Sequence, residues 1–107
     1  MTEVPAPRFH PEMLQALLEG RKRCTTRREK IGQPGDRFVL KPGKDLLGIT
    51  FLIKDIRSLP FGTIASKYYI CEGFKTEQAF RTFWVRIHRG QLPADDQARW
   101  LHVLERV

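Results

Sequence analysis

The ten-residue run 47–56 constrains the fold of this chain most, because its side chains alternate as they do along a β-strand. The two faces of the expected strand carry Ile49, Phe51 and Ile53 on one side and Thr50, Lys54 and Ile56 on the other. Shorter strands are expected at 37–40, after the turn 32–36, and at 99–106, whereas 41–45 reads as a connecting turn. The run is therefore the strongest strand that the sequence predicts.

Helical signals surround these strands. Pro11 and Gly20 delimit a helix of about residues 11–19, a short helix is expected over 63–70, and a longer one opens at Thr76 and stops at Gly90. The apolar stripe of the longer helix consists of Phe80, Phe83, Trp84, Ile87 and His88. We expect its aromatic residues in the core and His88 as a hydrogen-bonded core histidine. The order of elements predicts an α+β fold, a small and mostly antiparallel β-barrel with flanking helices.

The length of 107 residues suits a single domain, 1–107, in which residues 1–8 are expected to form a loose N-terminal tail. The sequence contains no apolar run long enough to cross a bilayer, and its N-terminus lacks the features of a signal peptide. We therefore expect a cytoplasmic protein that does not bind membranes. A monomer is the default expectation for its oligomeric state.

The two cysteines, Cys24 and Cys71, lie far apart and have no Cys-x-x-Cys partner. This spacing fits neither a zinc site nor a disulfide framework. We expect two reduced thiols and neither a bound metal nor a cofactor.

Positive charge is concentrated in residues 21–30, which contain six basic side chains and one acid. This stretch supplies five of the seven net positive charges, and it begins where the first helix stops. Such a density predicts an anionic partner, a nucleoside or RNA, although a basic surface without a partner is the simpler alternative. The candidate contacts to substrate or RNA are Gly20, Arg21, Arg23, Arg27, Arg28, Lys30 and Trp84.

The same stretch contains a recognisable motif. Gly20, Lys22 and Arg27 follow the pattern Gly-x-Lys-x-x-Glu-x-Arg, with Thr25 in the acidic position. Together with the later Gly35-Asp36 and Glu72-Gly73-Phe74, this pattern resembles the ASCH domain family of the PUA-like superfamily. That resemblance implies a small β-barrel associated with RNA.

The threonine resembles one branch of that family, the small bacterial N4-acetylcytidine amidohydrolases. The resemblance implies that Lys22, Thr25 and Glu72 are the catalytic residues. Arg23 and Cys24 depart from this branch, which usually has uncharged or apolar residues there.

A hydroxyl, an amine and a carboxylate can together hydrolyse an amide. We assign Thr25 as the nucleophile or as the residue that orients an attacking water, Lys22 as the base and Glu72 as the proton shuttle. Lys22 acts as a base only when neutral, a form that like charges on Arg21, Arg23 and Arg27 would favour. Lys22 and Thr25 converge only if a turn or bulge after Gly20 breaks strand alternation.

Each assignment has a plainer alternative. Lys22 could contact a phosphate, Thr25 could be an ordinary strand residue, and Glu72 could end a helix while paired with an arginine. The corresponding function is a non-catalytic RNA-binding module that uses the same basic cleft. A metal-assisted nuclease fits poorly, because the sequence has no clear cluster of acids and histidines. A deep pocket for one base favours the enzyme, whereas a continuous basic groove favours the binding module.

Overall fold

The computed structural model describes residues 2–41, 43 and 47–107, so the turn expected at 41–45 lies partly outside the described residues. The elements occur in the order α1 (Pro11–Leu18), β1 (Cys24–Arg27), β2 (Arg37–Leu40), β3 (Ile49–Pro60), α2 (Phe61–Lys67), α3 (Glu77–Ile87) and β4 (Ala98–Arg106).

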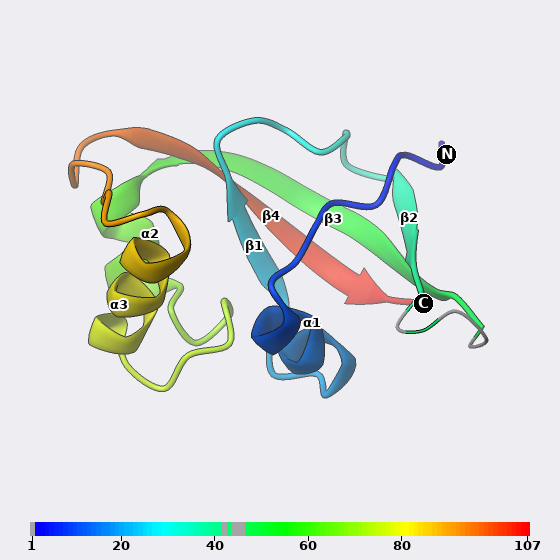
Figure 1. Ribbon diagram of the computed structural model, residues 1–107. Coiled ribbons are helices and arrows are strands. Elements are labelled where there is room, and N and C mark those ends of the chain that lie inside the picture. Colours follow the sequence, from blue (N-terminus) through cyan, green and yellow to red (C-terminus); the bar gives the residue numbers. More distant parts are fainter. Residues whose placement is uncertain (1, 42, 44–46) are drawn as a thin grey trace.

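The four strands form one antiparallel sheet in the order β1-β4-β3-β2. Figure 1 shows β3 and β4 as two long, curved ribbons, with β1 and β2 at the edges of the sheet. This half-barrel with three helices confirms the expected α+β fold. The sequence did not predict β1, a strand of only four residues within the basic stretch.

A bulge changes which side chains of β3 face inward. Ile53 pairs with Leu104 and Asp55 pairs with Val103, so Lys54 is the extra residue between two successive pairs. The inserted residue brings Ile56 to the apolar cluster that contains Ile53. The expectation that Ile56 shares a face with Thr50 and Lys54 was therefore wrong.

Helix boundaries follow local capping chemistry. Pro11 occupies the first turn of α1, and the Thr76 hydroxyl accepts a hydrogen bond from the Ala79 amide at 3.0 Å to begin α3. Both starts agree with the sequence-based expectation. The short helix α2 begins two residues earlier than expected and ends at Lys67.

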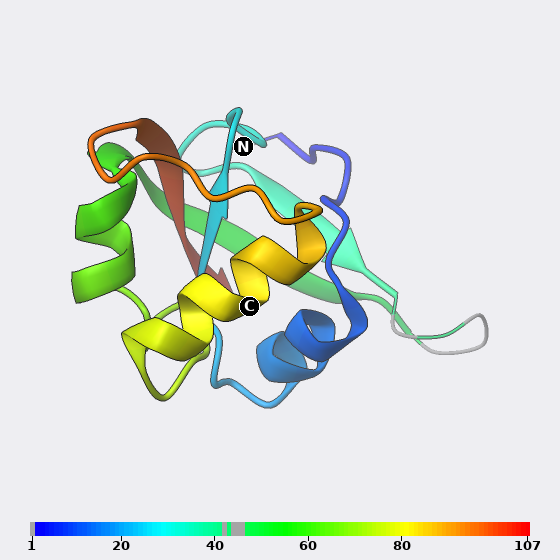
Figure 2. The same cartoon turned by 60° about the vertical axis from the view of Figure 1, so that its left-hand side comes forward.

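The helices cover the sheet in two places. Phe61, Ile64 and Trp84 of α2 and α3 pack on Leu101 of β4. Leu17 of α1 instead joins the cluster over β2 and β3, while Met13 and Ala16 of the same helix pack on Phe83 of α3. Figure 2 shows α3 passing across the front of the sheet between α2 and α1. Helices α1 and α3 therefore meet close to the edge strand β1.

Residues 2–8, expected as a loose tail, contact the sheet. The Val4 amide donates to the Arg37 carbonyl at 2.8 Å, and the Arg37 amide donates to the Thr2 carbonyl at 2.9 Å. Figure 1 shows the N-terminal stretch running from β2 towards α1. The path places Arg8 and Phe9 beside β1, where they take part in the site described next.

Candidate functional site

A cavity of about 120 Å³ lies where β1, the N-terminal stretch and α3 meet. Its polar side is lined by Lys22, Thr25, Thr26, Arg27 and Glu72, and its apolar side by Phe74, Phe80, Phe83 and Trp84. Cavities that hold drug-sized ligands measure roughly 300–1,000 Å³. The cavity is therefore matched to a group of about one heterocycle.

The turn after α1 carries Lys22 into this cavity. Gly20 has a positive φ of 81°, and the amides of Arg21 and Lys22 both donate to the Ala16 carbonyl, which turns the chain back beneath the helix. Lys22 thus lies before β1 begins and is not subject to strand alternation. This turn satisfies the condition under which Lys22 and Thr25 were expected to converge, since both line the cavity.

Glu72 reaches the cavity from the segment after α2. The amides of Arg23 and Cys24 donate to the Cys71 carbonyl at 2.7 and 3.0 Å, so the segment is hydrogen-bonded to the start of β1. Gly73 follows with a φ of 100°, and a Cβ there would lie 3.2 Å from the Cβ of Lys22. A glycine at this position lets the Glu72 turn approach Lys22 closely.

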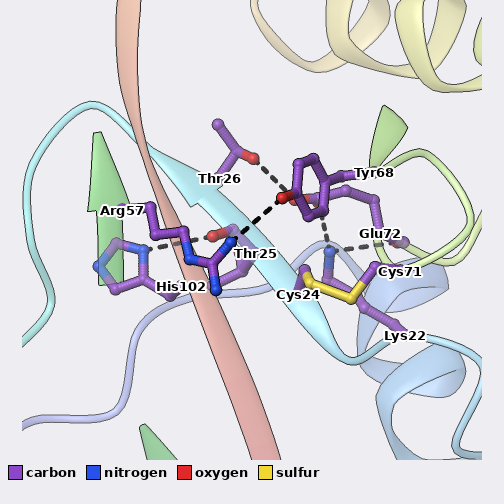
Figure 3. Close-up of a disulfide and its surroundings, with 9 residues drawn as sticks. All are labelled: Lys22, Cys24, Thr25, Thr26, Arg57, Tyr68, Cys71, Glu72 and His102. Carbon is purple, nitrogen blue, oxygen red and sulfur yellow. Dashed lines mark hydrogen bonds and ion pairs between the residues drawn. A yellow bond between two sulfur atoms is a disulfide. The ribbon is translucent and has the colours of Figure 1, made fainter. Parts of the chain in front are cut away.

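Lys22 and Glu72 form a buried ion pair, with relative exposures of 4% and 3%. The Lys22 Nζ is 2.9 Å from Glu72 Oε1 and donates also to the Glu72 carbonyl at 3.2 Å. The Thr26 hydroxyl donates to the other carboxylate oxygen, Oε2, at 2.7 Å, and Figure 3 shows these contacts converging. Glu72 is thus paired with a lysine, whereas the plainer interpretation paired it with an arginine.

Thr25 belongs to a second polar group. Its Oγ1 accepts a hydrogen bond from Arg27 Nε at 3.1 Å, and Arg27 Nη2 donates to the Arg8 carbonyl at 2.8 Å. The Arg27 guanidinium also lies 4.7 Å from the ring centre of Phe9. Desolvation lowers the pKa of Arg27 and the Glu72 carboxylate opposes that shift, yet the guanidinium remains charged. A fixed positive charge therefore stands beside the Thr25 hydroxyl.

The two threonines line the same cavity but have different hydrogen-bond partners. Among the described residues, no hydrogen bond joins Thr25 directly to Lys22 or Glu72, and the threonine that bonds Glu72 is Thr26. Sequence reasoning missed Thr26, because the contact of its hydroxyl with Glu72 arises only when the Glu72 segment packs on β1.

The expectation of two reduced thiols was wrong: Cys24 and Cys71 form a disulfide. Their Cα atoms are 5.2 Å apart although 47 residues separate them in sequence. Cys24 directly precedes Thr25, and Cys71 directly precedes Glu72. Figure 3 shows that the bridge joins the two segments that carry the polar side of the cavity.

Other basic residues of the stretch 21–30 lie outside the cavity. Arg21 forms an exposed ion pair with Glu19, and Arg23 is also exposed, so neither lines this cavity. The close charged partner of Lys22 is therefore a carboxylate rather than the like charges that were expected. Lys30 instead lies 4.6 Å from the ring centre of Trp100.

Helix α3 supplies the apolar wall. Phe80, Phe83 and Trp84 are buried, as expected for core residues, and they also line the cavity. His88 stacks on Trp84 with 4.4 Å between ring centres, and its Nδ1 lies 2.9 Å from the Trp84 carbonyl. His88 is hydrogen-bonded but exposed, so its expected place in the core was wrong, because it follows the last turn of α3.

A groove of about 470 Å³ adjoins the cavity and shares four residues with it. The shared residues are Thr26, Arg27, Trp84 and His88. Arg28 and Arg99 line the rest of its basic side.

Two kinds of feature, a metal-binding cluster and a membrane-spanning helix, are absent from the described residues. No three histidine, cysteine, aspartate or glutamate side chains there come together as a metal would require. No helix in the same residues has the length and apolar character needed to cross a membrane.

Neither a family model nor a curated protein matches this sequence. Solved structures do match. The ASCH domain from Lactobacillus crispatus JV V101 aligns with a TM-score of 0.67 at 15% identity, over 98% of this chain and 79% of that one. The hypothetical protein PH0355 aligns with a TM-score of 0.65 at 16% identity, over 99% and 98% of the two chains.

A third structure, protein EF3133 from Enterococcus faecalis V583, described as family DUF984, aligns with a TM-score of 0.62 at 13% identity. That alignment covers 99% of this chain and 75% of the other. At these identities the likeness concerns the fold alone. The chain has an ASCH-like fold.

Proposed function

We propose that this chain is an amidohydrolase that removes the acyl group from an N4-acylated cytosine nucleoside such as N4-acetylcytidine, without a metal. The observation that carries the proposal is the Lys22–Glu72 ion pair, buried in a cavity with room for about one heterocycle. Buried ion pairs are a poor means of stabilising a fold, because desolvation offsets their attraction. A charge pair buried beside a cavity is instead a candidate functional site.

The aromatic wall suits a flat base. Trp84 and Phe83 offer ring surfaces on the apolar side of the cavity, whereas the ion pair occupies the polar side. A cytosine between them directs its exocyclic amide towards Lys22 and Thr25. This placement supports hydrolysis of the bond between N4 and the acyl carbon.

The ion pair holds the proton that the reaction needs. Transfer of that proton from Lys22 to Glu72 leaves a neutral amine, which accepts a proton from the attacking hydroxyl or water. Oxygen bonds to the acyl carbon, the C–N bond breaks, and Glu72 returns its proton to the departing cytosine amine. Lys22 is then an ammonium and Glu72 a carboxylate, as at the start. Where Thr25 is the nucleophile, water attacks the acyl-threonine ester in a second round of the same proton transfers, which releases the carboxylic acid and restores the threonine hydroxyl.

Thr25 is the attacking hydroxyl or the group that orients water, and Arg27 assists it. Because the Arg27 Nε–H occupies an acceptor site of Thr25 Oγ1, the threonine hydroxyl hydrogen is directed elsewhere. The guanidinium also places positive charge where the acyl oxygen becomes an oxyanion. Thr26 acts as a positioning residue by holding Glu72 Oε2.

The direct test is incubation of the purified protein with N4-acetylcytidine and chromatographic detection of cytidine and acetate. We expect Lys22→Arg, Thr25→Val and Glu72→Gln each to remove nearly all turnover, and double substitutions to add little, because the residues act as a unit. Lys67→Arg, on the exposed end of α2, is the matched control for Lys22→Arg. Circular dichroism would establish that each variant is folded.

Arginine retains the charge of Lys22 but has no accessible neutral form, so it cannot accept the proton. If folded Lys22→Arg retained turnover, Lys22 would not be the base. Should the arginine fail to fit, Lys22→Met supplies a second variant of similar length. Independent losses of only a few-fold at each position would exclude a shared mechanism.

A second candidate function is a non-catalytic RNA-binding module, and the basic groove beside the cavity favours it. Absence of hydrolysis together with tight, salt-sensitive RNA binding would replace the enzyme with this module.

A further inference from the structure

The cavity and the groove lie next to each other. Their shared residues include Thr26 and Arg27 on β1 and Trp84 on α3, so these side chains form the boundary between the two spaces. The two spaces differ in volume, about 120 Å³ against about 470 Å³. A ligand that fills both has a small flat part and a larger, extended part.

Volume assigns the parts of a nucleoside to the two spaces. The cavity accepts about one heterocycle, so the ribose of a bound nucleoside must lie outside it. A ribose that extends past the boundary at Arg27 and Trp84 lies in the groove. Any phosphate on that ribose is then carried along the groove.

The charges of the groove match a phosphate. Arg27, Arg28 and Arg99 line it, and its lining contains no aspartate or glutamate. Among the described residues, none of the ion pairs involves these three arginines, whereas Arg21, Arg57, Arg81 and Arg86 each have a carboxylate partner. Guanidinium groups that are not engaged by carboxylates are well suited to bind phosphate oxygens.

We infer that the substrate of this site carries a phosphate on its ribose, and that Arg28 and Arg99 bind this phosphate in the groove while the base occupies the cavity. The inference rests on the proposed function for the identity of the base. It makes a phosphorylated nucleoside, free or within RNA, a better ligand than the bare nucleoside. Arg27 stands at the junction and contacts both parts.

The test compares three acylated substrates with the same protein. They are N4-acetylcytidine, its 5′-monophosphate and an oligoribonucleotide with a single N4-acetylcytidine. We expect kcat/KM for the monophosphate to exceed that for the nucleoside by about tenfold or more at low ionic strength, and the advantage to shrink with added salt. The oligoribonucleotide distinguishes the two sources of phosphate, since a further gain would identify RNA and a loss would identify the free nucleotide.

Charge variants locate the phosphate. Arg28→Ala and Arg99→Ala should each lower the ratio of the two kcat/KM values towards one, and Lys67→Ala, which removes the same charge on α2, should not. The corresponding comparison without turnover is the ratio of the dissociation constants of cytidine and cytidine 5′-monophosphate, measured by calorimetry. Binding therefore tests the groove even if the protein hydrolyses nothing.

The two proposals fail separately. Hydrolysis in which the nucleoside equals the monophosphate, with no effect of Arg28 or Arg99, would overturn the phosphate site and leave the amidohydrolase intact. Absent hydrolysis with tenfold tighter binding of the monophosphate would overturn the amidohydrolase and keep the groove. A ratio that falls equally in Lys67→Ala would show an effect of overall charge alone, and would overturn the inference.

Discussion

Burial makes Lys22 and Glu72 depend on each other. At exposures of 4% and 3%, neither charge is solvated by bulk water, and each is stabilised by the other at 2.9 Å. Removing one partner leaves an unpaired charge inside the protein, a change that costs about 3–5 kcal/mol. The two residues of the proposed mechanism therefore also carry a folding cost when altered singly.

We predict that Lys22→Met and Glu72→Leu each lower the free energy of unfolding by about 3–5 kcal/mol, and that the double variant loses much less than the sum. The reason is that two apolar side chains leave no unpaired charge. Urea denaturation at neutral pH measures the four free energies. Additive losses would show that the pair is not coupled. The double variant should be inactive even where it is stable, which separates folding from chemistry.

Substitutions of Thr25 and Thr26 should affect the reaction differently. Thr26→Val removes the donor to Glu72 Oε2 but no proposed reacting atom, so we predict a fall in kcat of up to about a hundredfold with KM little changed. Thr26→Ser should restore the rate because it restores the hydroxyl. If Thr26→Ser rescued nothing, Thr26 would have no role in the site.

Thr25→Val should abolish turnover. Mass spectrometry of the quenched reaction then decides whether Thr25 carries an acyl group.

At the scale of elements, the Cys24–Cys71 disulfide closes a long loop that contains β2, β3 and α2. Cross-linking lowers the entropy of the unfolded chain, and a loop of this length is worth about 4 kcal/mol in the chain-entropy account. The bridge also attaches β1 to the segment that carries Glu72. Its loss should affect the whole domain and the site together.

We predict that a thiol reductant lowers the melting temperature of the wild type but not that of the Cys24→Ala/Cys71→Ala double variant. The double variant should melt where the reduced wild type melts, because both lack the cross-link. Differential scanning calorimetry with and without reductant makes the comparison. A reductant effect of equal size in the double variant would mean that the bridge is not its cause.

His102 connects β4 to two other segments. Its Nε2 accepts a hydrogen bond from the Ile31 amide at 3.1 Å, so the ring is neutral with its proton on Nδ1, which lies 3.2 Å from the Thr25 carbonyl. Desolvation lowers the pKa of this fully buried imidazole, and the nearby charges of Arg27 and Lys30 lower it further against opposing backbone hydrogen bonds. Protonation would break the bond to Ile31.

Stability should therefore fall in acid. In the unfolded state the histidine pKa is near 6.5, so the unfolded chain binds a proton at pH values where native His102 does not. The free energy of unfolding therefore decreases as the pH falls below that value. His102→Gln should flatten this dependence between about pH 7 and 5. Denaturation at several pH values measures it. If the variant does not fold, an NMR titration of wild-type His102 serves instead, and an ordinary or raised pKa would refute the account.

The elements show what sequence patterns can and cannot predict. Periodicity and capping residues predicted α1 and α3, because both signals are local. The pattern did not predict β1, whose four residues hydrogen-bond to β4 at the far end of the chain. The same limit explains the Cys24–Cys71 pairing, since its geometry arises only after the Glu72 segment has packed on β1. Ile56 was misplaced because a bulge has no signature in side-chain alternation.

At the scale of the whole molecule, the basic side chains behind the net charge of +7 do not form one uniform surface. Arg21 is paired at the surface, Lys22 is buried, Arg27 lines the cavity and Arg28 lines the groove. The charged residues of the basic stretch thus differ in environment, which their order in the sequence does not reveal. Only some of these charges line the groove for which we propose a phosphate ligand.

We predict that binding of a single-stranded oligoribonucleotide weakens steeply with salt and that Arg28→Ala/Lys30→Ala reduces the slope of log affinity against log salt. Each lost phosphate contact should lower the slope by about 0.7 for a single strand, without a change in sequence preference. Lys67→Ala, which changes a residue that does not line the groove, should keep the wild-type slope. Fluorescence anisotropy across a salt series measures all three proteins. If even low ionic strength gives no RNA binding, the groove serves a small phosphorylated ligand and the RNA-binding module is excluded.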